Sequence, residues 1–290
     1  MELYKLYNPI TATPFKCTQE YKEYAPCDAL KPYIRCFWGS EKIVTQKPSD
    51  GSITGIITPD TCMDIMFTVD FTNNKIYDSF CGIDDRTFMI SDLHNEKRTV
   101  FLFSIRFYAW GVPMFADESM KGTKNTFFDV AYYFSKLKKE IEPLLFHVNS
   151  VYELIPKVES VLMKTYNAQH ENNTVLHAVY HMLKNRGNLS ISQLKQELHI
   201  SERQLERLFM EYVGVSPKGL ASMVRYQYLW NDIVYNRQLD ILDAVCKYGY
   251  SDQAHLCHDF KKYHSMNIAD AIKYAMKNVG NIQENLANSP

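Results

Sequence analysis

The feature that most constrains this chain is an internal repeat near its C-terminal end. Residues 201–209 read SERQLERLF, and residues 252–260 read DQAHLCHDF. A shift of 51 residues superimposes a helix-capping residue, a Leu and a Phe. These pairs are Ser201 with Asp252, Leu205 with Leu256, and Phe209 with Phe260. Similarity at a fixed distance indicates a repeated structural unit, and two copies are too few for a solenoid. The repeat therefore predicts a paired module.

The first copy has the pattern of two short helices joined by a tight turn. Ser190 and Gln193 fit a capping box, which satisfies backbone donors where a helix begins. A second box, Ser201 with Gln204, follows the short turn at 199–200. In the next helix Leu205, Leu208 and Phe209 share one face and are expected to pack inward. This pattern predicts a helix-turn-helix.

The second copy repeats this plan with different caps. Asp240 and Asp252 stand where two helices should begin. Gly249 lies in the turn between them, where a positive φ costs glycine little. Leu256 and Phe260 are expected to face inward. The second copy is therefore also predicted to be a helix-turn-helix.

A single long helix is predicted to connect the two units. Ser216 and Pro217 are a favourable start, with Ser as the cap and Pro at the first helical position. An apolar stripe then runs to about Tyr235. A helix of this length spans roughly 28 Å. Two helices that enter successive major grooves of DNA need a separation of about 34 Å, so the length suits that purpose, although it also suits an ordinary helical bundle.

Together these residues resemble the AraC/XylS transcription regulators over roughly residues 175–275. The matching text is Leu205 and Phe209, Gly-Val-Ser-Pro at 214–217, Gly-Tyr-Ser-Asp-Gln at 249–253 and Phe-Lys-Lys at 260–262. The resemblance implies an all-α domain of two helix-turn-helix units joined by a long helix. It also implies double-stranded promoter DNA and RNA polymerase as partners, a role as an activator or a repressor of transcription, and no cofactor. Three positions depart from the family: Ser265 and Ile268 replace a Gly and a Pro, and His258 replaces a common recognition-helix Arg.

Two arginines are the strongest candidates for reading bases. Arg203 and Arg207 lie four residues apart, opposite the inward face of their helix. Arginine is the usual bidentate partner of guanine in the major groove. Glu206 could accept from a cytosine amino group or hold Arg203. The alternative is a solvated arginine stripe that is paired with Glu202 and Glu206.

In the second unit the groove-facing positions are implied by the family resemblance. The expected base-facing residues are Gln253, His255, Cys257 and His258. Lys261 and Lys262 are expected to contact phosphate. None of the four base-facing side chains carries a permanent charge, so this unit is expected to be the weaker reader.

The N-terminal half has a different character, with 14 of the 16 phenylalanines before Asn173. Strand patterns occupy 34–44, 53–57, 63–69, 75–83 and 99–107, and short strands at this spacing suggest a barrel or a sandwich. Helical periodicity follows at 127–147 and 151–166, so an α+β domain is expected. The predicted boundaries are 1–167 for a β-rich regulatory, effector or dimerisation domain, 168–173 for a linker, 174–280 for the DNA-binding domain and 281–290 for a flexible tail.

The most distinctive N-terminal stretch is Pro-Asp-Thr-Cys-Met-Asp at 59–64. With Phe-Ser-Ile-Arg-Phe at 103–107 and Trp110-Gly111, it resembles an uncharacterised sensor domain that is fused to some AraC-type regulators. That domain usually has Gly where this chain has Thr61 and Ser104. The resemblance implies a regulatory role without a known ligand.

A small-molecule effector pocket is one interpretation of this domain. Pockets are typically apolar with a few polar groups. The expected lining is Phe37, Trp38, Phe67, Phe103 and Phe107, with Asp64 and Arg106 as the polar groups. The alternatives are an ordinary aromatic core and an ion pair of Arg106 with Asp60 or Asp64, since buried charges are usually paired. Homodimerisation through the helices at 127–166 is a further possibility.

Charge and composition narrow the class of protein. The formal net charge is −1 overall and +2 from Thr174 onward, with 13 basic and 11 acidic side chains there, so any basic stripe must be local. The N-terminus has no signal-peptide pattern, and no apolar run reaches the length of a membrane helix. Seven widely spaced cysteines favour reduced thiols in the cytoplasm.

Catalytic and metal patterns are weak. His255, Cys257, His258 and His264 do not have the spacing of a zinc site. Asp84 and Asp85 suit a solvated turn, and no phosphate-binding or Gly-x-Ser-x-Gly loop is present. We therefore expect no enzyme activity and no metal. Two alternatives stay open: a DNA-repair methyl acceptor, for which Cys17, Cys27, Cys36 and Cys62 stand too far apart to form a cysteine knuckle, and a sugar- or peptide-binding module without DNA function.

Overall fold

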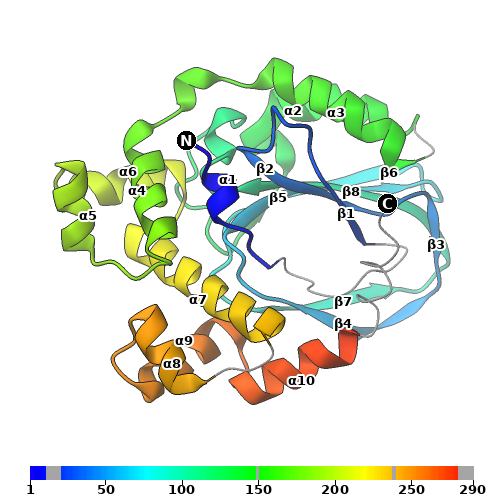
Figure 1. Cartoon of the computed structure of the whole chain (residues 1–290). Helices are drawn as coiled ribbons and strands as arrows, with labels where there is room; N and C mark the ends of the chain where they lie inside the picture. Colours follow the sequence, from blue (N-terminus) through cyan, green and yellow to red (C-terminus); the bar gives the residue numbers. More distant parts are fainter. Residues whose placement is uncertain (11–20, 148–149, 237–239, 280–290) are drawn as a thin grey trace.

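A computed structural model describes residues 1–10, 21–147, 150–236 and 240–279 of the chain. Among these residues, the strands all lie in the N-terminal half, together with three helices, and the C-terminal half is helical (Figure 1). The strands are β1 (Lys22–Tyr24), β2 (Ile34–Gly39), β3 (Val44–Gln46), β4 (Ser49–Ile57), β5 (Cys62–Asp70), β6 (Lys75–Cys81), β7 (Phe88–His94), β8 (Arg98–Tyr108) and β9 (Phe127–Phe128). The N-terminal helices are α1 (Leu3–Leu6), α2 (Val130–Leu145) and α3 (Val151–Thr165), with short 3-10 turns η1 (Val112–Met114) and η2 (Ala168–His170). The C-terminal helices are α4 (Asn173–Lys184), α5 (Ile191–Leu198), α6 (Glu202–Tyr212), α7 (Pro217–Asn236), α8 (Ile241–Tyr248), α9 (Gln253–His264) and α10 (Ile268–Val279).

The strands form two antiparallel sheets. Seven belong to one sheet in the order β1-β2-β8-β5-β6-β9, with β3 also paired to β8. Strands β4 and β7 pair with each other and lie opposite the larger sheet (Figure 1). Within the described residues, no strand pairing closes these sheets into a barrel. The sequence predicted a barrel or a sandwich. The described strands form two separate sheets and no closed barrel.

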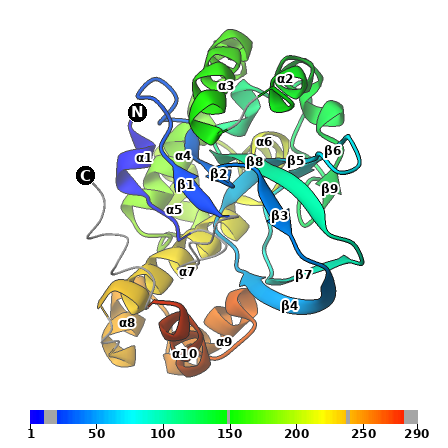
Figure 2. The same ribbon diagram turned by 90° about the vertical axis from the view of Figure 1, so that its right-hand side faces the viewer.

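The larger sheet has one apolar face and one more polar face. Its long strand β8 buries Phe101, Phe103, Ile105 and Phe107, which alternate with residues on the other face. Helices α2 and α3 cover the apolar face (Figure 2). Phe134 of α2 packs there, with its ring centroid 4.9 Å from that of Phe80. This aromatic layer is the core of the N-terminal half.

The sequence predicted most of the elements of this half but misplaced some of their boundaries. The predicted strands correspond to β2, β4, β5, β6 and β8, whereas β7 and the short strands β1 and β3 were not predicted. The predicted helix at 127–147 starts too early, because Phe127 and Phe128 form β9 and pair with Cys81 and Phe80. The helix begins at Val130, after Asp129 accepts a hydrogen bond from the amide of Ala131.

The C-terminal helices contain the two predicted helix-turn-helix units, α5–α6 and α8–α9. The capping box of Ser190 and Gln193 is present, and Asp240 and Asp252 cap α8 and α9. The turns contain residues with left-handed backbone, His199 at φ 52° and Gly249 at φ 64°. The repeated apolar residues Leu205, Phe209, Leu256 and Phe260 are all fully buried. The sequence repeat is therefore a structural repeat.

Helix α7 joins the two units (Figure 1). The hydroxyl of Ser216 accepts a hydrogen bond from the amide of Gly219, as the predicted cap requires. Its 20 residues correspond to a rod of about 30 Å. None of the described helices is both long enough and apolar enough to span a membrane.

The N-terminal half contacts the C-terminal helices through loops at one end of the larger sheet. After β8, the amide of Met120 donates to the carbonyl of Glu211 at the end of α6 (2.8 Å). After β6, the hydroxyl of Thr87 donates to the carbonyl of Tyr263 at the end of α9 (2.8 Å). Gly214, with φ +78°, permits the first contact, because a Cβ there would lie 2.7 Å from the Met120 carbonyl oxygen. The second helix of each helix-turn-helix unit, α6 and α9, is thus held at its C-terminal end.

Candidate functional site

The outer face of α6 carries the three residues that we predicted to read bases in the first unit. Arg203 and Arg207 are exposed and Glu206 is half-buried, while Leu205 and Phe209 point into the core. Arg207 forms an ion pair with Glu211 at 3.2 Å, and both side chains face solvent. Within the described part of the chain, Arg203 and Glu206 form no ion pair, and Glu202 pairs with Lys195. The alternative stripe, in which Glu202 and Glu206 hold the arginines, is therefore not formed.

The corresponding face of α9 is also open to solvent. Its exposed side chains include all six residues predicted for the second unit: Gln253, His255, Cys257, His258, Lys261 and Lys262. The ring of His255 is fixed near the turn, since its Nδ1 lies 3.1 Å from the hydroxyl of Ser251. The ammonium of Lys262 lies 4.8 Å from the centroid of the Tyr263 ring. The fold therefore presents these residues, although it does not show DNA contact.

Helix α9 is anchored to α7 by an ion pair that sequence reasoning missed. Arg225 Nη2 lies 2.8 Å from Asp259 Oδ2, and each side chain is about one-seventh exposed. The same guanidinium lies 4.1 Å from the centroid of the Tyr250 ring. The partners are 34 residues apart, so no local pattern connects them. The only signal was a charged residue inside the apolar stripe of α7.

A second buried contact fixes the end of α9. The hydroxyl of Tyr226 on α7 lies 2.8 Å from Nδ1 of His264. Burial lowers the pKa of His264 to about 4, so its imidazole is neutral near pH 7. This histidine therefore packs inside the domain. Among the described residues, no three His, Cys, Asp or Glu side chains are grouped so that they could hold a metal ion.

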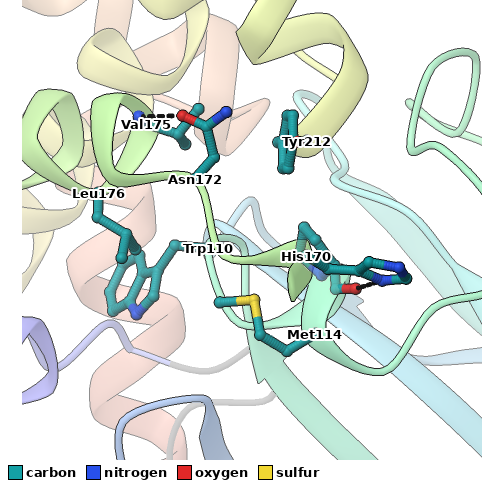
Figure 3. Close-up of a pocket in the computed structure, with 8 residues that line it drawn as sticks. Trp110, Met114, His170, Asn172, Val175, Leu176 and Tyr212 are labelled. Atoms are coloured by element: carbon teal, nitrogen blue, oxygen red, sulfur yellow. Dashed lines mark hydrogen bonds between the residues drawn. The ribbon is translucent and has the colours of Figure 1, made fainter. Parts of the chain in front are cut away.

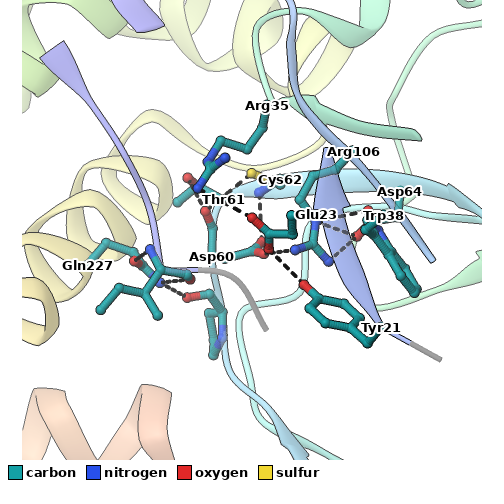
Figure 4. Close-up of polar contacts among 12 residues, drawn as sticks. Tyr21, Glu23, Arg35, Trp38, Asp60, Thr61, Cys62, Asp64, Arg106 and Gln227 are labelled. Atoms are coloured by element: carbon teal, nitrogen blue, oxygen red, sulfur yellow. Dashed lines mark hydrogen bonds and ion pairs between the residues drawn. The ribbon is translucent and has the colours of Figure 1, made fainter. Parts of the chain in front are cut away.

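The polar face of the larger sheet carries a buried charged cluster around Arg106 (Figure 4). Arg106 Nε donates to Asp64 Oδ1 at 2.9 Å, and the indole of Trp38 donates to the same oxygen at 2.8 Å. Asp60 Oδ2 lies 3.7 Å from Arg106 Nη1. Burial raises the pKa of Asp60 to about 6, while Arg106 lowers it and Asp64 raises it. The predicted ion-pair alternative is thus the arrangement that the structure shows.

The seven predicted effector residues lie on two faces of this sheet. Trp38, Asp64 and Arg106 meet on the polar face, as described above. The four phenylalanines are buried in the core on the helix-covered face: Phe37, Phe67, Phe103 and Phe107. Alternation along each strand separates the two sets, so they do not line one common pocket. Effector binding by any of the seven residues stays a prediction.

A small pocket lies where the N-terminal half meets α4 and α6 (Figure 3). Its empty space is about 200 Å³, part of which is open solvent. The lining residues are Trp110, Pro113, Met114, His170, Asn172, Val175, Leu176 and Tyr212. Ligand pockets usually enclose about 300–1,000 Å³, so this one is too small for a typical effector.

Comparison with known families identifies both halves of the chain. Residues 194–273, which contain both capped helix pairs and α7, match the family model described as "Helix-turn-helix domain". The C-terminal region is a helix-turn-helix domain of the AraC type. Residues 22–129 match the model "Domain of unknown function (DUF6597)", in agreement with the uncharacterised sensor domain suggested by the sequence. An AraC-type domain indicates DNA binding in transcription regulation, and it points away from an enzyme.

No curated protein matches the chain. Solved structures with a similar course of the backbone include ToxT from Vibrio cholerae O395 bound to (E)-4-(8-methylnaphthalen-1-yl)but-3-enoic acid, at 12% identity and a TM-score of 0.40 over 82% of this chain and 99% of that one. Unsaturated fatty acid-bound wild-type ToxT from Vibrio cholerae strain SCE256 matches at 11% identity and a TM-score of 0.40, over 81% and 94% of the two chains.

Proposed function

We propose that this protein is a sequence-specific transcription regulator in which α6 is the main base-reading helix. The observation that supports this most directly is the solvent-facing pair Arg203 and Arg207 on the second helix of an AraC-type unit. Leu205 and Phe209 hold that helix against the domain, so its outer face is fixed in direction. A rigid helix with two outward arginines is suited to the major groove.

The chemistry of reading follows from the guanidinium group. Arg207 offers two parallel N–H donors, which match O6 and N7 of guanine. Arg207 forms an ion pair with Glu211, and both side chains are exposed. Exposed ion pairs contribute only about 0–1 kcal/mol to stability, so the arginine can exchange Glu211 for a base. Arg203 lies one turn closer to the start of α6. Glu206 would accept from a cytosine amino group.

The second unit is proposed to add affinity more than sequence preference. Lys261 and Lys262 would contact phosphates, and such contacts depend on salt but carry no sequence information. Gln253, His255, Cys257 and His258 would face the groove without a permanent charge. The difference between the two permanently charged arginines of α6 and the uncharged groove-facing side chains of α9 supports this division between sequence preference and affinity.

The N-terminal half is proposed to control the DNA-binding domain, with residues 1–167 as the regulatory domain, 168–173 as the linker and 174–280 as the DNA-binding domain. Its loops contact the ends of α6 and α9, which supports a regulatory connection. A small-molecule effector, a homodimer, RNA polymerase as a partner, activation of promoters and a cytoplasmic location complete the proposal. Unlike these finer points, the DNA-reading role has a direct test.

The test uses fluorescence anisotropy to measure binding to labelled promoter fragments and compares it with binding to unrelated DNA. Arg207→Ala should weaken specific binding by about 1–3 kcal/mol and relax the sequence preference. Lys273→Ala, on the exposed side of α10, is the matched loss of one positive charge away from α6 and should have little effect. Unchanged specific binding of Arg207→Ala would refute the assignment. A wild-type protein that shows no preference for promoter DNA would favour a binding module without DNA function, and stoichiometric zinc in the purified protein would favour the methyl-acceptor alternative.

A further inference from the structure

The stretch Pro59–Asp64 was the most distinctive N-terminal motif, and the proposed DNA reading does not use it. In the structure it forms the turn that leads into β5, followed by the first residues of that strand. Thr61 has φ 62°, a left-handed conformation that is uncommon for a β-branched residue. Glycine, the usual residue at this position in the resembling sensor domains, adopts such a conformation readily. The turn therefore has a specific, strained shape that the surrounding contacts must maintain.

One side of this turn is fixed to the charged cluster of the sheet. Arg106 pairs with Asp64 on β5 and approaches Asp60 within the turn at 3.7 Å. Asp60 also accepts a hydrogen bond from the amide of Cys62 at 3.0 Å. Arg106 is only 3% exposed, so its charge depends on these carboxylates for compensation. A change in the charge or pairing of the cluster must therefore act on the turn.

The other side of the turn is fixed to α7. Gln227 is fully buried, and its Nε2 donates to the carbonyl of Pro59. Its Oε1 accepts from the amide of Ile10 at 2.9 Å. The hydroxyls of Thr61 and Tyr7 lie 2.9 Å apart, and the Tyr7 ring packs against Tyr228, also on α7. Figure 4 shows Asp60 and Thr61 between Gln227 and Arg106.

We propose that the turn at 59–61 is the joint through which the Arg106 cluster controls the position of α7, and that Gln227 is the residue that transmits it. Because α7 carries a helix-turn-helix unit at each end, a shift at Gln227 reaches both reading helices. The other loop contacts, at Thr87 and Met120, involve no member of the charged cluster. This inference rests on the proposed DNA-binding function and specifies how the N-terminal half would regulate it.

The test is a double-mutant cycle on promoter-DNA affinity in the full chain. Asp60→Asn keeps the shape of the side chain and removes its charge, and it should change the Kd at least roughly threefold, as expected for residues of one network. In a Gln227→Leu background the same substitution should leave the Kd unchanged. In a Tyr228→Phe background it should keep its full effect, because this variant loses only the hydroxyl that donates to the Leu6 carbonyl and keeps the ring that packs against Tyr7.

Three outcomes would refute the proposed role of the turn at 59–61. Asp60→Asn could leave the Kd unchanged in a folded protein, its effect could be the same with and without Gln227, or it could vanish in Tyr228→Phe as well. If Asp60→Asn does not fold, Trp38→Phe removes a donor to Asp64 at the half-exposed edge of the cluster, and the cycle is repeated with that variant. Failure of the proposed DNA function is distinguishable, since the wild-type chain itself would then show no promoter preference.

Discussion

Arg225 on α7 donates a hydrogen bond to Asp259 on α9 across 2.8 Å, with its guanidinium over the ring of Tyr250. Asp259 directly follows His258, so this pair sets the direction of the second reading face. Removing one partner of a buried ion pair leaves a charge without compensation and typically costs about 3–5 kcal/mol.

Asp259→Ala should therefore lower the free energy of unfolding by roughly 3 kcal/mol, near the lower end of that range, because the pair is partly exposed. Urea unfolding measures this loss, and footprinting should show that protection of the second half-site is lost first. Glu202→Ala is the control, since its ion pair with Lys195 is exposed and should contribute less than about 1 kcal/mol. Equal small losses in the two variants would contradict the anchoring role.

The two units should contribute unequally to sequence preference. Arg207→Ala removes a bidentate donor that is permanently charged, whereas His258→Ala removes a side chain without a permanent charge. We expect the first variant to lose the specific footprint and the second to retain it with weaker protection at one half-site. A footprint that disappears in His258→Ala but persists in Arg207→Ala would reverse the order of the two readers.

The C-terminal fold could be predicted because its determinants are local. Capping residues such as Ser190 and Asp252 and apolar residues such as Leu205 and Phe260 act within one or two helical turns, so their spacing is visible in the sequence. The anchoring pair was not predictable, because Arg225 and Asp259 meet only after α7 and α9 pack. In the N-terminal half, alternation predicted the main strands and already places Phe103 and Arg106 on opposite faces, but it does not show which of these faces the helices α2 and α3 cover.

Ser265 ends α9 with φ 58°, where the family usually has a glycine. Side chains with a Cβ are less stable than glycine in this conformation by about 1 kcal/mol. Ser265→Gly should therefore raise the free energy of unfolding by roughly that amount, which urea titration can detect. Ser251→Gly is the control, since Ser251 has no left-handed backbone and its hydroxyl bonds His255. That variant should be neutral or destabilised, and a gain equal to that of Ser265→Gly would exclude the backbone explanation.

Asp84 should make stability fall as the pH rises. Burial raises its pKa to about 7, so the folded protein holds this proton through a pH range in which the unfolded chain has already released it. Between about pH 4 and pH 7 the folded state binds more protons, and its stability decreases with increasing pH. Asp84→Asn should therefore stabilise the protein more at pH 8 than at pH 5, as measured by urea midpoints at both values.

The neighbouring carboxylate provides an internal control of opposite sign. Burial would raise the pKa of Asp85, but hydrogen bonds from Lys124 and Asn125 hold it below its usual range. Its contribution is present above the unfolded pKa and is lost as the pH falls. Asp85→Asn should therefore destabilise the protein at pH 8. If both substitutions shifted the midpoint in the same direction at pH 8, the assignment of the two environments would be wrong.

The hydrogen bond between the Ile10 amide and Gln227 joins positions that are 217 residues apart. During synthesis the first ten residues leave the ribosome long before their partner exists. At 5–20 residues per second the interval is on the order of 10–40 s. Throughout that interval the Tyr7 ring lacks its contact with Tyr228, and the backbone amide of Ile10 lacks its acceptor, the side-chain oxygen of Gln227. The contacts of Tyr7 and Ile10 with α7 therefore form only after this helix, in the last third of the chain, has been synthesised, and the nascent N-terminal half lacks them until then.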